Sequence, residues 1–408
     1  MERRPCWVEI DTCAFEDNYR LLAAASNDAA EDAARLELLA IVKANAYGHG
    51  LELCAPAAVR AGARWLGVTS VEEGVAARRC AADAKILVIG GPFAGQGAEV
   101  IAHRLTAVVW EHWQLDELEA AARRAGCAAS SVAVHLELDT GMNRQGVGAD
   151  GLDGVLTRFV RSDSPLRLDG VMTHLYAADE SDDVATRQQL AELERMLERM
   201  MERVMAAAGL SGRPIWLHLG NSAAVLGGKV TRALREVCGR WGLRAMARPG
   251  LALYGLAPEI SGESPETVAA ASLRRVLRWK TRVVSLHSID AGQMVGYNGT
   301  FVATEPMRLA LLAVGYADGL NRALSNRGWV LIRGERAPIV GRISMDQTVV
   351  DVTGIADVVV MDEVVLLGRQ GGDAITAEDH ARWAATIPWE IFTSIGARVE
   401  RREVRSGP

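Results

Sequence analysis

The sequence predicts an α/β protein with an N-terminal (β/α)8 barrel of the TIM type, followed by a C-terminal domain of mostly β-structure. Short apolar segments alternate with helical ones over the first two-thirds of the chain, and eight such units in about 250 residues match a barrel of this kind. Beyond Pro258 the pattern changes to alternating runs with glycine-containing turns, which is typical of antiparallel strands. An open, doubly wound sheet is the main alternative for the first part.

Eight apolar runs are the predicted barrel strands. They are mostly rich in Val, Ile and Leu and nearly continuous in hydrophobicity, as expected for strands buried on both faces. The runs are Leu38–Val42, Trp65–Thr69, Ile86–Ile89, Thr106–Trp110, Val132–Leu138, Leu168–His174, Ile215–Leu219 and Arg244–Arg248. The segments between them predict helices, most clearly at 184–208, where Leu and Met side chains form one stripe and charged side chains the other.

The domain boundary is predicted near residues 256–275, where 260–265 looks like a linker and 266–275 a short helix. We therefore expect residues 11–265 to form the barrel and residues 266–408 the β domain. Residues 1–10 contain a strand at 7–10 that is expected to join the β domain. The other predicted strands of that domain are Thr281–His287, Leu309–Val314, Trp329–Arg333, Pro338–Val340, Thr348–Val352 and Val358–Leu367.

Composition and charge exclude several classes of protein. Of the 408 residues, 49% are hydrophobic and 24% charged, which excludes a disordered or fibrous chain, and the formal net charge of -6 provides no basic surface for nucleic acid. No uncharged apolar run is long enough to span a membrane, and no apolar segment follows the basic N-terminus as in a signal peptide. The six cysteines are scattered without paired motifs, which predicts reduced thiols in a cytoplasmic protein. We expect no metal site.

Lys43 directly follows the first predicted barrel strand. Barrel enzymes carry their active sites at the C-terminal ends of the strands. A lysine in the low dielectric of that region has a lowered pKa and reacts as a nucleophile with carbonyl groups. The simpler alternative is a lysine whose ammonium group extends from the strand end into water.

Further polar residues follow the later strands. The fifth to eighth strands lead to Glu137, Asp139, Arg144, His174, His218 and Arg248. Residues 220–222, Gly-Asn-Ser, begin a predicted helix, whose N–H groups and polar side chains suit a phosphate group. Each residue alone has an ordinary structural explanation. Together at one end of a barrel, they suit a phosphorylated aldehyde cofactor, pyridoxal 5'-phosphate.

The segment 42–50, Val-Lys-Ala-Asn-Ala-Tyr-Gly-His-Gly, resembles the lysine signature of the alanine racemase family, whose members depend on pyridoxal phosphate (fold type III). Other motifs of that family follow in the same order over essentially the whole chain. They are Asp139–Arg144, Thr173–His174, His218–Ala224, Arg248–Gly250, Val295–Tyr297, Gly315–Gly319 and Val340–Gln347.

The resemblance implies an isomerase that interconverts L-alanine and D-alanine as a homodimer with shared active sites. Lys43 would bind the cofactor covalently and act as one catalytic base. Tyr297 of the partner chain would be the second base, on the opposite face of the cofactor. Two bases suit the reaction, because racemisation removes a proton from one face and returns it to the other. The product would supply cell-wall peptidoglycan or alanine catabolism.

The resemblance also implies a set of binding residues. Those for the cofactor are Lys43, Tyr47, His174, His218, Asn221, Ser222, Arg248, Gly250, Leu251 and Trp389. In this set the phosphate would lie at Tyr47, Ser222, Gly250 and Leu251, with Asn221 close by, and the pyridine nitrogen at Arg248, with His218 behind it. Those for the substrate are Arg144, Met345 and Tyr316, the last at an entrance formed with the partner chain.

Three positions depart from the common family pattern. Glu137 stands where many members have a carbamylated lysine, and we expect its carboxylate to lie beside Arg144. Ser344 replaces a frequent cysteine. Trp389 stands where a phosphate-contacting tyrosine is usual, which leaves a serine or broad-specificity racemase as the alternative function.

Two other functions fit the sequence less well. Basic amino-acid decarboxylases resemble the same two-domain scaffold but use a cysteine of the second domain, whereas the last cysteine here is Cys238. A non-catalytic pyridoxal-phosphate carrier resembles the barrel alone and would not need Tyr297.

Overall fold

The computed structural model describes residues 4–27, 35–178, 180, 182–205, 215–258 and 268–406. They belong to two compact units. The barrel unit comprises Phe15–Ala46 and Cys54–Arg274, and the β unit comprises Met1–Ala14, Tyr47–Leu53 and Arg275–Pro408. The predicted linker at 260–265 and the last three residues of the helix predicted at 184–208 lie outside the described residues.

Eight parallel strands close into a barrel, in which the last strand pairs with the first. This confirms the predicted fold class, and the open-sheet alternative is wrong. The strands are β2 (Glu37–Ile41), β3 (Trp65–Val68), β4 (Lys85–Val88), β5 (Thr106–Val109), β6 (Val132–Glu137), β7 (Leu166–Met172), β8 (Trp216–His218) and β9 (Arg244–Ala247). Each strand overlaps one of the eight predicted apolar runs. The runs identify the strands because nearly all residues of a barrel strand are buried and therefore apolar.

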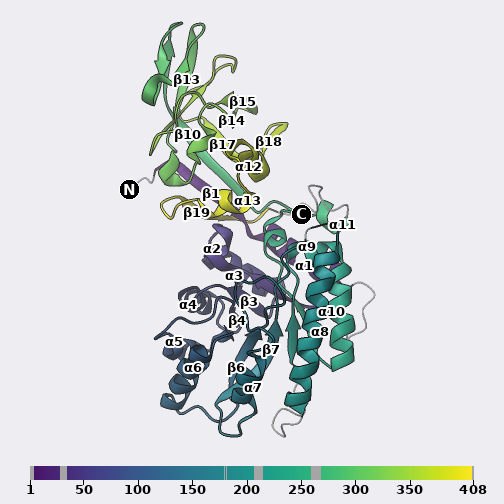
Figure 1. The fold of residues 1–408 in the computed structure, drawn as a ribbon. Helices are drawn as coiled ribbons and strands as arrows, with labels where there is room; N and C mark the ends of the chain where they lie inside the picture. Colours follow the sequence, from purple (N-terminus) through teal and green to yellow (C-terminus); the bar gives the residue numbers. More distant parts are fainter. Residues whose placement is uncertain are drawn as a thin grey trace. The chain divides into compact units, whose positions relative to one another are not determined.

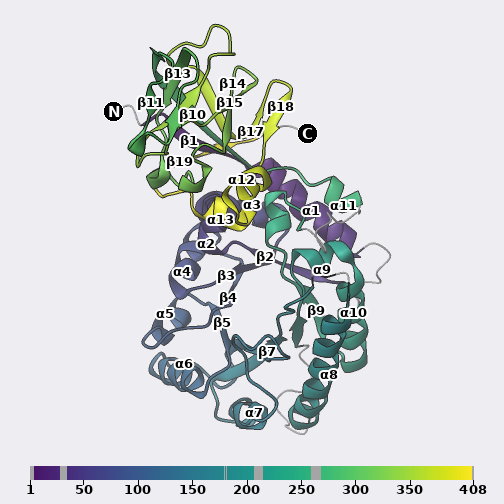
Figure 2. The same ribbon diagram turned by 45° about the horizontal axis from the view of Figure 1, so that its top comes forward.

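Helices surround the ring of strands (Figure 2). They are α1 (Thr12–Asn27), α3 (Leu51–Arg60), α4 (Val71–Cys80), α5 (Gly97–Ala102), α6 (His112–Arg124), α7 (Leu152–Val160), α8 (Val184–Met205), α9 (Ser222–Gly227) and α10 (Lys229–Trp241). Two further short segments are α2 (Lys43–Tyr47) and α11 (Val268–Ala271). None of the helices in the described ranges is both long and apolar enough to cross a bilayer.

The β unit is built on one long strand, β10 (Leu277–Ile289), which pairs with three other strands and has a register shift in two of these pairings (Figure 1). The main path of its sheet is β15-β14-β17-β10-β1-β19, and β13, β16 and β18 branch from it. β1 (Cys6–Asp11) lies antiparallel to β10 and parallel to β19 (Glu400–Val404). The remaining elements are β11 (Met294–Val295), β12 (Phe301–Val302), β13 (Met307–Leu312), β14 (Trp329–Ile332), β15 (Glu335–Pro338), β16 (Thr348–Asp351), β17 (Glu363–Gln370), β18 (Asp373–Ile375), α12 (Ala377–Ala384) and α13 (Pro388–Thr393).

Two strand predictions in this unit are shifted. The run at 358–367 predicts a strand, but 358–362 forms a turn in which Asp362 accepts a hydrogen bond from the Val359 N–H at 2.9 Å and Met361 has φ +75°. The strand β17 therefore begins at Glu363. β15 likewise lies before the predicted run at 338–340, because a tight hairpin pairs it with β14.

The barrel interior is packed closely around His135, which has no exposed surface. A Cβ atom added at Gly170 of β7 would lie 2.6 Å from two ring atoms of His135. The ring is fixed by a 2.8 Å contact between its Nδ1 and Nε2 of His218, so it has little freedom to move.

We therefore expect Gly170→Ala to destabilise the protein by about 1–3 kcal/mol through overpacking. Gly239→Ala is the matched control, because Gly239 lies in α10 with nothing within 4 Å of its added Cβ. The control should be neutral or stabilising by up to about 1 kcal/mol, since alanine favours a helix. Urea unfolding of both variants measures the difference; equal stabilities would contradict the tight packing.

Candidate active site

Lys43 lies at the carboxyl end of β2, at the start of a left-handed turn. The four residues after it, Ala44 to Tyr47, have φ between +52° and +55°, and none of them is glycine. Such a conformation costs about 1–2 kcal/mol per residue, so it persists only where the surroundings fix it. Strain of this kind is concentrated at functional sites.

The surroundings of Lys43 favour its neutral form. Burial lowers the pKa of the Lys43 ammonium group, and the positive charges of Arg144 and Arg248 lower it further, while Glu73 opposes them. A lysine that is more often deprotonated is a better nucleophile toward a carbonyl group. Lys43 therefore has the lowered pKa that its position after a barrel strand predicts.

Arg248 connects the ends of three neighbouring strands. Its Nη1 donates to the backbone oxygen of His218 at 2.7 Å and contacts Nδ1 of the same residue at 3.3 Å. Its Nη2 donates to the backbone oxygen of Thr173 at 2.8 Å and contacts Nδ1 of His174 at 3.2 Å. Burial lowers the pKa of Arg248 to about 10, so the guanidinium remains charged near neutral pH.

The charged guanidinium determines the state of the histidines around it. Because it can only donate, Nδ1 of His218 and Nδ1 of His174 must accept, which requires neutral rings protonated at Nε2. Burial and nearby positive charge agree with this assignment, since they lower the pKa of His174 to about 3 and that of His218 well below its usual value. Nε2–H of His218 then donates to Nδ1 of His135 at 2.8 Å.

Beside Arg248, Ser222 joins the ends of β8 and β9. Its Oγ accepts hydrogen bonds from the N–H groups of Gly250 at 3.0 Å and Ala252 at 3.1 Å. Asn221 caps α9 by accepting from the N–H of Ala224 at 3.1 Å, and Leu251 begins a short 3-10 helix at 251–254. With both acceptor positions of Ser222 used, its O–H remains to donate to a further acceptor. This donor lies at the barrel end that also carries the buried Arg248 cation and the desolvated Lys43, and such a set of groups fits an anionic aldehyde such as pyridoxal phosphate.

Glu137 has a hydrogen-bond partner that the sequence does not predict. Its buried carboxylate accepts a hydrogen bond from Nε2 of Gln145 at 2.5 Å, while Arg144 acts on it through its charge. The chain after β6 turns back so that the Val147 N–H donates to the Glu137 backbone oxygen at 2.8 Å, which brings Gln145 over the carboxylate. Burial raises the pKa of Glu137, and Gln145, Arg248 and Arg144 oppose the rise.

The remaining residues from the sequence analysis belong to the β unit. Tyr297 (67% exposed), Met345 (53%) and Tyr316 (41%) present their side chains at its surface. Trp389, in α13, is half-buried, and Tyr47 is buried, which raises its pKa to about 12.

The loops that carry Tyr316 and Met345 are held together. The Tyr316 N–H donates to the Ser344 backbone oxygen, and the Ala317 N–H to that of Met345, both at 3.0 Å. A Cβ at Gly315 would lie 2.3 Å from the Ser344 oxygen, so this approach of two backbones requires glycine.

Three residues of the site were not singled out from the sequence. They are Glu73, which contacts the turn after Lys43, His135, which extends the hydrogen bonds of His218, and Gln145. His135 carried a usable signal, because it lies two residues from Glu137 on the same strand and therefore on the same face. Glu73 carried no such signal, because its carboxylate accepts hydrogen bonds from backbone N–H groups, which almost every residue type provides.

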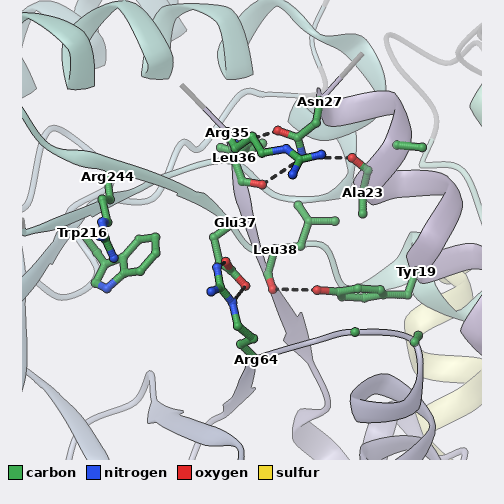
Figure 3. Close-up of a pocket in the computed structure, with 13 residues that line it drawn as sticks. Tyr19, Ala23, Asn27, Arg35, Leu36, Glu37, Leu38, Arg64, Trp216 and Arg244 are labelled. Carbon is green, nitrogen blue, oxygen red and sulfur yellow. Dashed lines mark hydrogen bonds and ion pairs between the residues drawn. The ribbon is translucent and has the colours of Figure 1, made fainter. Parts of the chain in front are cut away.

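A cavity of about 800 Å³ lies at the opposite end of the barrel, where the strands begin (Figure 3). Arg64 and Glu37 form an ion pair there, and the Arg244 guanidinium lies over the Trp216 ring at 5.5 Å. None of the predicted site residues lines this cavity. In barrels this end serves stability rather than catalysis, so the candidate site is the end that carries Lys43.

Comparison with known proteins identifies the family. The model of the alanine racemase N-terminal domain matches residues 10–258, and that of the alanine racemase C-terminal domain matches residues 276–403. The chain belongs to the alanine racemase family. It is 40% identical to the alanine racemase of Symbiobacterium thermophilum over 398 residues, which cover 98% of this chain and 97% of that protein.

Solved structures of alanine racemases have the same fold. The enzyme of Streptomyces lavendulae superimposes with a TM-score of 0.85 at 33% identity, covering 100% of this chain and 99% of that one. The alanine racemase of Bartonella henselae, with covalently bound pyridoxal phosphate, has a TM-score of 0.78 at 26% identity and covers 98% of this chain and 99% of its own. The chain is thus an enzyme of the alanine racemase type, with both domains of that family.

The raised pKa of Glu137 predicts a pH-dependent contribution to stability. The folded state keeps the proton of this carboxyl to a higher pH than the unfolded chain does, so stability falls as pH rises from the ordinary carboxyl range through the raised value. Glu137→Gln cannot ionise and retains an amide that can bond Gln145. The unfolding free energy of the wild type relative to this variant should therefore decrease with rising pH.

Urea unfolding over a series of pH values measures this difference. The exposed Glu202 of α8 provides the control substitution to Gln for the loss of one carboxylate. A difference between wild type and Glu137→Gln that does not change with pH would refute the raised pKa.

Proposed function

We propose that the enzyme interconverts L-alanine and D-alanine with pyridoxal 5'-phosphate bound covalently at Lys43. The observation that supports this most is the desolvated Lys43, on which the charges of Arg144 and the buried Arg248 act, on the same barrel end as the Ser222 hydroxyl. When bound, pyridoxal phosphate withdraws electrons from an attached amino acid and thereby acidifies its α-hydrogen.

In this proposal, residues that mostly belong to the barrel unit hold the cofactor. Ser222, Gly250 and Leu251, with Tyr47, bind the phosphate through hydroxyl and backbone donors, and Asn221 and Trp389 adjoin it. Arg248 donates to the pyridine nitrogen, while His174 and His218 keep the guanidinium oriented through the contacts described above. A guanidinium can only donate a hydrogen bond and is positively charged, so Arg248 disfavours a protonated pyridine nitrogen. The cofactor would then withdraw electrons less strongly, which favours return of the α-proton over transamination.

Lys43 and Tyr297 are the proposed pair of bases. Racemisation needs one group to take the α-proton on one face and another to return it on the other face. Tyr297 is two-thirds exposed on the β unit, which agrees with its use by a second copy of the chain in a homodimer. Arg144 and the Met345 N–H bind the substrate carboxylate, and Tyr316 lines the entrance.

The proposed role in the cell is the supply of D-alanine for peptidoglycan, or the catabolism of alanine. The partners are a small amino acid and a second copy of the chain. The cysteines are free thiols, which agrees with a reducing cytoplasm.

We expect the purified protein to absorb at the violet edge of the visible range and to incorporate borohydride label at Lys43 only. Lys43→Ala should lose the absorption. Tyr297→Phe should keep it but lose about 10²- to 10⁴-fold in racemisation, because one base is removed while cofactor binding remains. Spectra, peptide mapping and a chiral assay measure these results; label at another residue, or near-normal racemisation by Tyr297→Phe, would overturn the assignment.

Mixing Lys43→Ala and Tyr297→Phe chains tests the shared site. Each mixed dimer should regain both bases in one of its two sites, and racemisation should return. No recovery despite demonstrated subunit exchange would exclude sharing of Tyr297 between chains.

A serine or broad-specificity racemase is the second candidate, because the half-buried Trp389 replaces a tyrosine at the cofactor. The indole is larger and donates one hydrogen bond but accepts none, so we expect it to fill space and favour alanine. Weak serine turnover would not alter this, since an apolar pocket rejects an added hydroxyl by only about 10²-fold.

The measurement is kcat/KM for L-alanine, L-serine, L-lysine and L-arginine in wild type and Trp389→Tyr. Alanine should lead in both, with negligible turnover of the basic amino acids. A wild-type preference for serine that changes to alanine in Trp389→Tyr would identify a serine racemase instead.

A further inference from the structure

Glu73 connects the turn after Lys43 to the neighbouring strand end. It is the third residue of α4, and its Oε1 accepts a hydrogen bond from the Ala44 N–H at 2.6 Å. Its Oε2 accepts from the Thr69 N–H, just beyond β3, at 2.9 Å. One carboxylate thus joins the ends of β2 and β3 at the point where the reactive lysine begins.

This use of a helix-start glutamate differs from ordinary capping. Ser70 caps α4 by accepting from the Glu73 N–H at 3.3 Å, and in a capping box the glutamate would bond back to the N–H of the cap residue itself. Here the carboxylate extends past Ser70 to Thr69 and across to Ala44. Ser70 already caps the helix, so α4 does not need the Glu73 carboxylate to begin there. The carboxylate therefore acts on the turn after Lys43.

The turn needs such a contact, because four consecutive non-glycine residues in it are left-handed. Within the turn the Ala46 N–H donates to the Val42 backbone oxygen at 2.9 Å, and Glu73 binds the first N–H after Lys43. These hydrogen bonds, one of them to a charged acceptor, are among the interactions that hold the segment against its own strain.

Glu73 also differs in charge from the other groups that act on Lys43. Arg144, which follows β6, and Arg248, which follows β9, are positive, and the nearby His174 is neutral. Glu73 on α4 is the carboxylate that acts on Lys43 in the opposite sense.

We propose that Glu73 is a positioning residue for Lys43: it holds the left-handed turn that aims the lysine and balances part of the positive charge around it. Its effect on racemisation rests on the proposed function, whereas its effect on the turn does not. Removing the carboxylate should loosen the turn and let Lys43 lose its proton at a lower pH.

The test uses Glu73→Ala, Glu73→Gln and the control Glu72→Gln, all prepared without cofactor. Glu72 is exposed, precedes Glu73 on the same helix and accepts from Nε2 of Gln96 at 2.7 Å, so its replacement removes an equal charge away from the turn. Hydrogen exchange at the amides of Ala44 and Thr69 is measured by NMR. Glu73→Ala should accelerate it about 10- to 100-fold, as expected for loss of a hydrogen bond to a charged group, while Glu72→Gln should leave it unchanged.

A second measurement follows the rate at which pyridoxal phosphate attaches to each apoprotein as a function of pH. Because the neutral amine reacts, Glu73→Gln should move the midpoint of this profile to lower pH, and Glu72→Gln should move it much less. Glu73→Gln also keeps an amide oxygen for one of the two N–H groups, so it remains informative if Glu73→Ala fails to fold.

Two results together would overturn the proposal. They are an unchanged rate of hydrogen exchange at the Ala44 amide in both Glu73 variants, and a pH midpoint of cofactor attachment in Glu73→Gln that is no different from that in Glu72→Gln. Attachment of pyridoxal phosphate to a residue other than Lys43 would instead overturn the proposed function and leave the exchange result standing. In the holoenzyme, Glu73→Gln should lower kcat and leave KM for alanine nearly unchanged, since the Glu73 carboxylate binds the backbone at Ala44 and Thr69 and neither residue is a proposed substrate-binding residue. A change confined to KM would count against the proposal.

Discussion

A buried guanidinium among neutral acceptors is the constraint on which the rest of the barrel end depends. Arg248 has almost no exposed surface, and burying its charge is tolerable only because the guanidinium is hydrogen-bonded. Its N–H groups donate to the backbone oxygens of Thr173 and His218 and to two imidazole nitrogens. These bonds fix the ends of β7, β8 and β9 relative to each other. They also force both histidines into the neutral form, and the Ser222 hydroxyl is held by N–H groups of the chain just beyond Arg248.

The same charge shapes the chemistry of its neighbours. With Arg144 it helps to keep the pKa of Lys43 low. The Glu137 carboxylate is hydrogen-bonded to Gln145, and that of Glu73 to the backbone at the turn. The barrel end is therefore rich in positive charge. Within the described residues Arg248 forms no ion pair, because its N–H groups donate to neutral acceptors. Such a surface suits a phosphorylated cofactor and an amino-acid carboxylate, both of them anions.

Much of this arrangement could be predicted from the sequence, because barrel strands buried on both faces form continuous apolar runs and reactive groups follow their ends. The positions of Lys43, Ser222 and Arg248 after strand ends follow from this pattern. Contacts made by chain return or to the backbone could not be predicted: Gln145 reaches Glu137 only because the loop after β6 folds back, and Glu73 bonds N–H groups that every residue type provides. The apolar run at 358–367 predicts a strand that begins too early, because Val359, Val360 and Met361 are apolar yet exposed in a turn.

The most direct test of this account is the protonation state of the pyridine nitrogen in the holoenzyme, measured by ¹⁵N NMR with labelled pyridoxal phosphate. A guanidinium with a pKa of about 10 donates its hydrogen bond and keeps its proton throughout the neutral range. We expect an unprotonated, hydrogen-bonded nitrogen at every pH from about 6 to about 9, below the pKa of Arg248. A protonated ring nitrogen in that range would contradict it, because Arg248 would then not be the group that faces the ring.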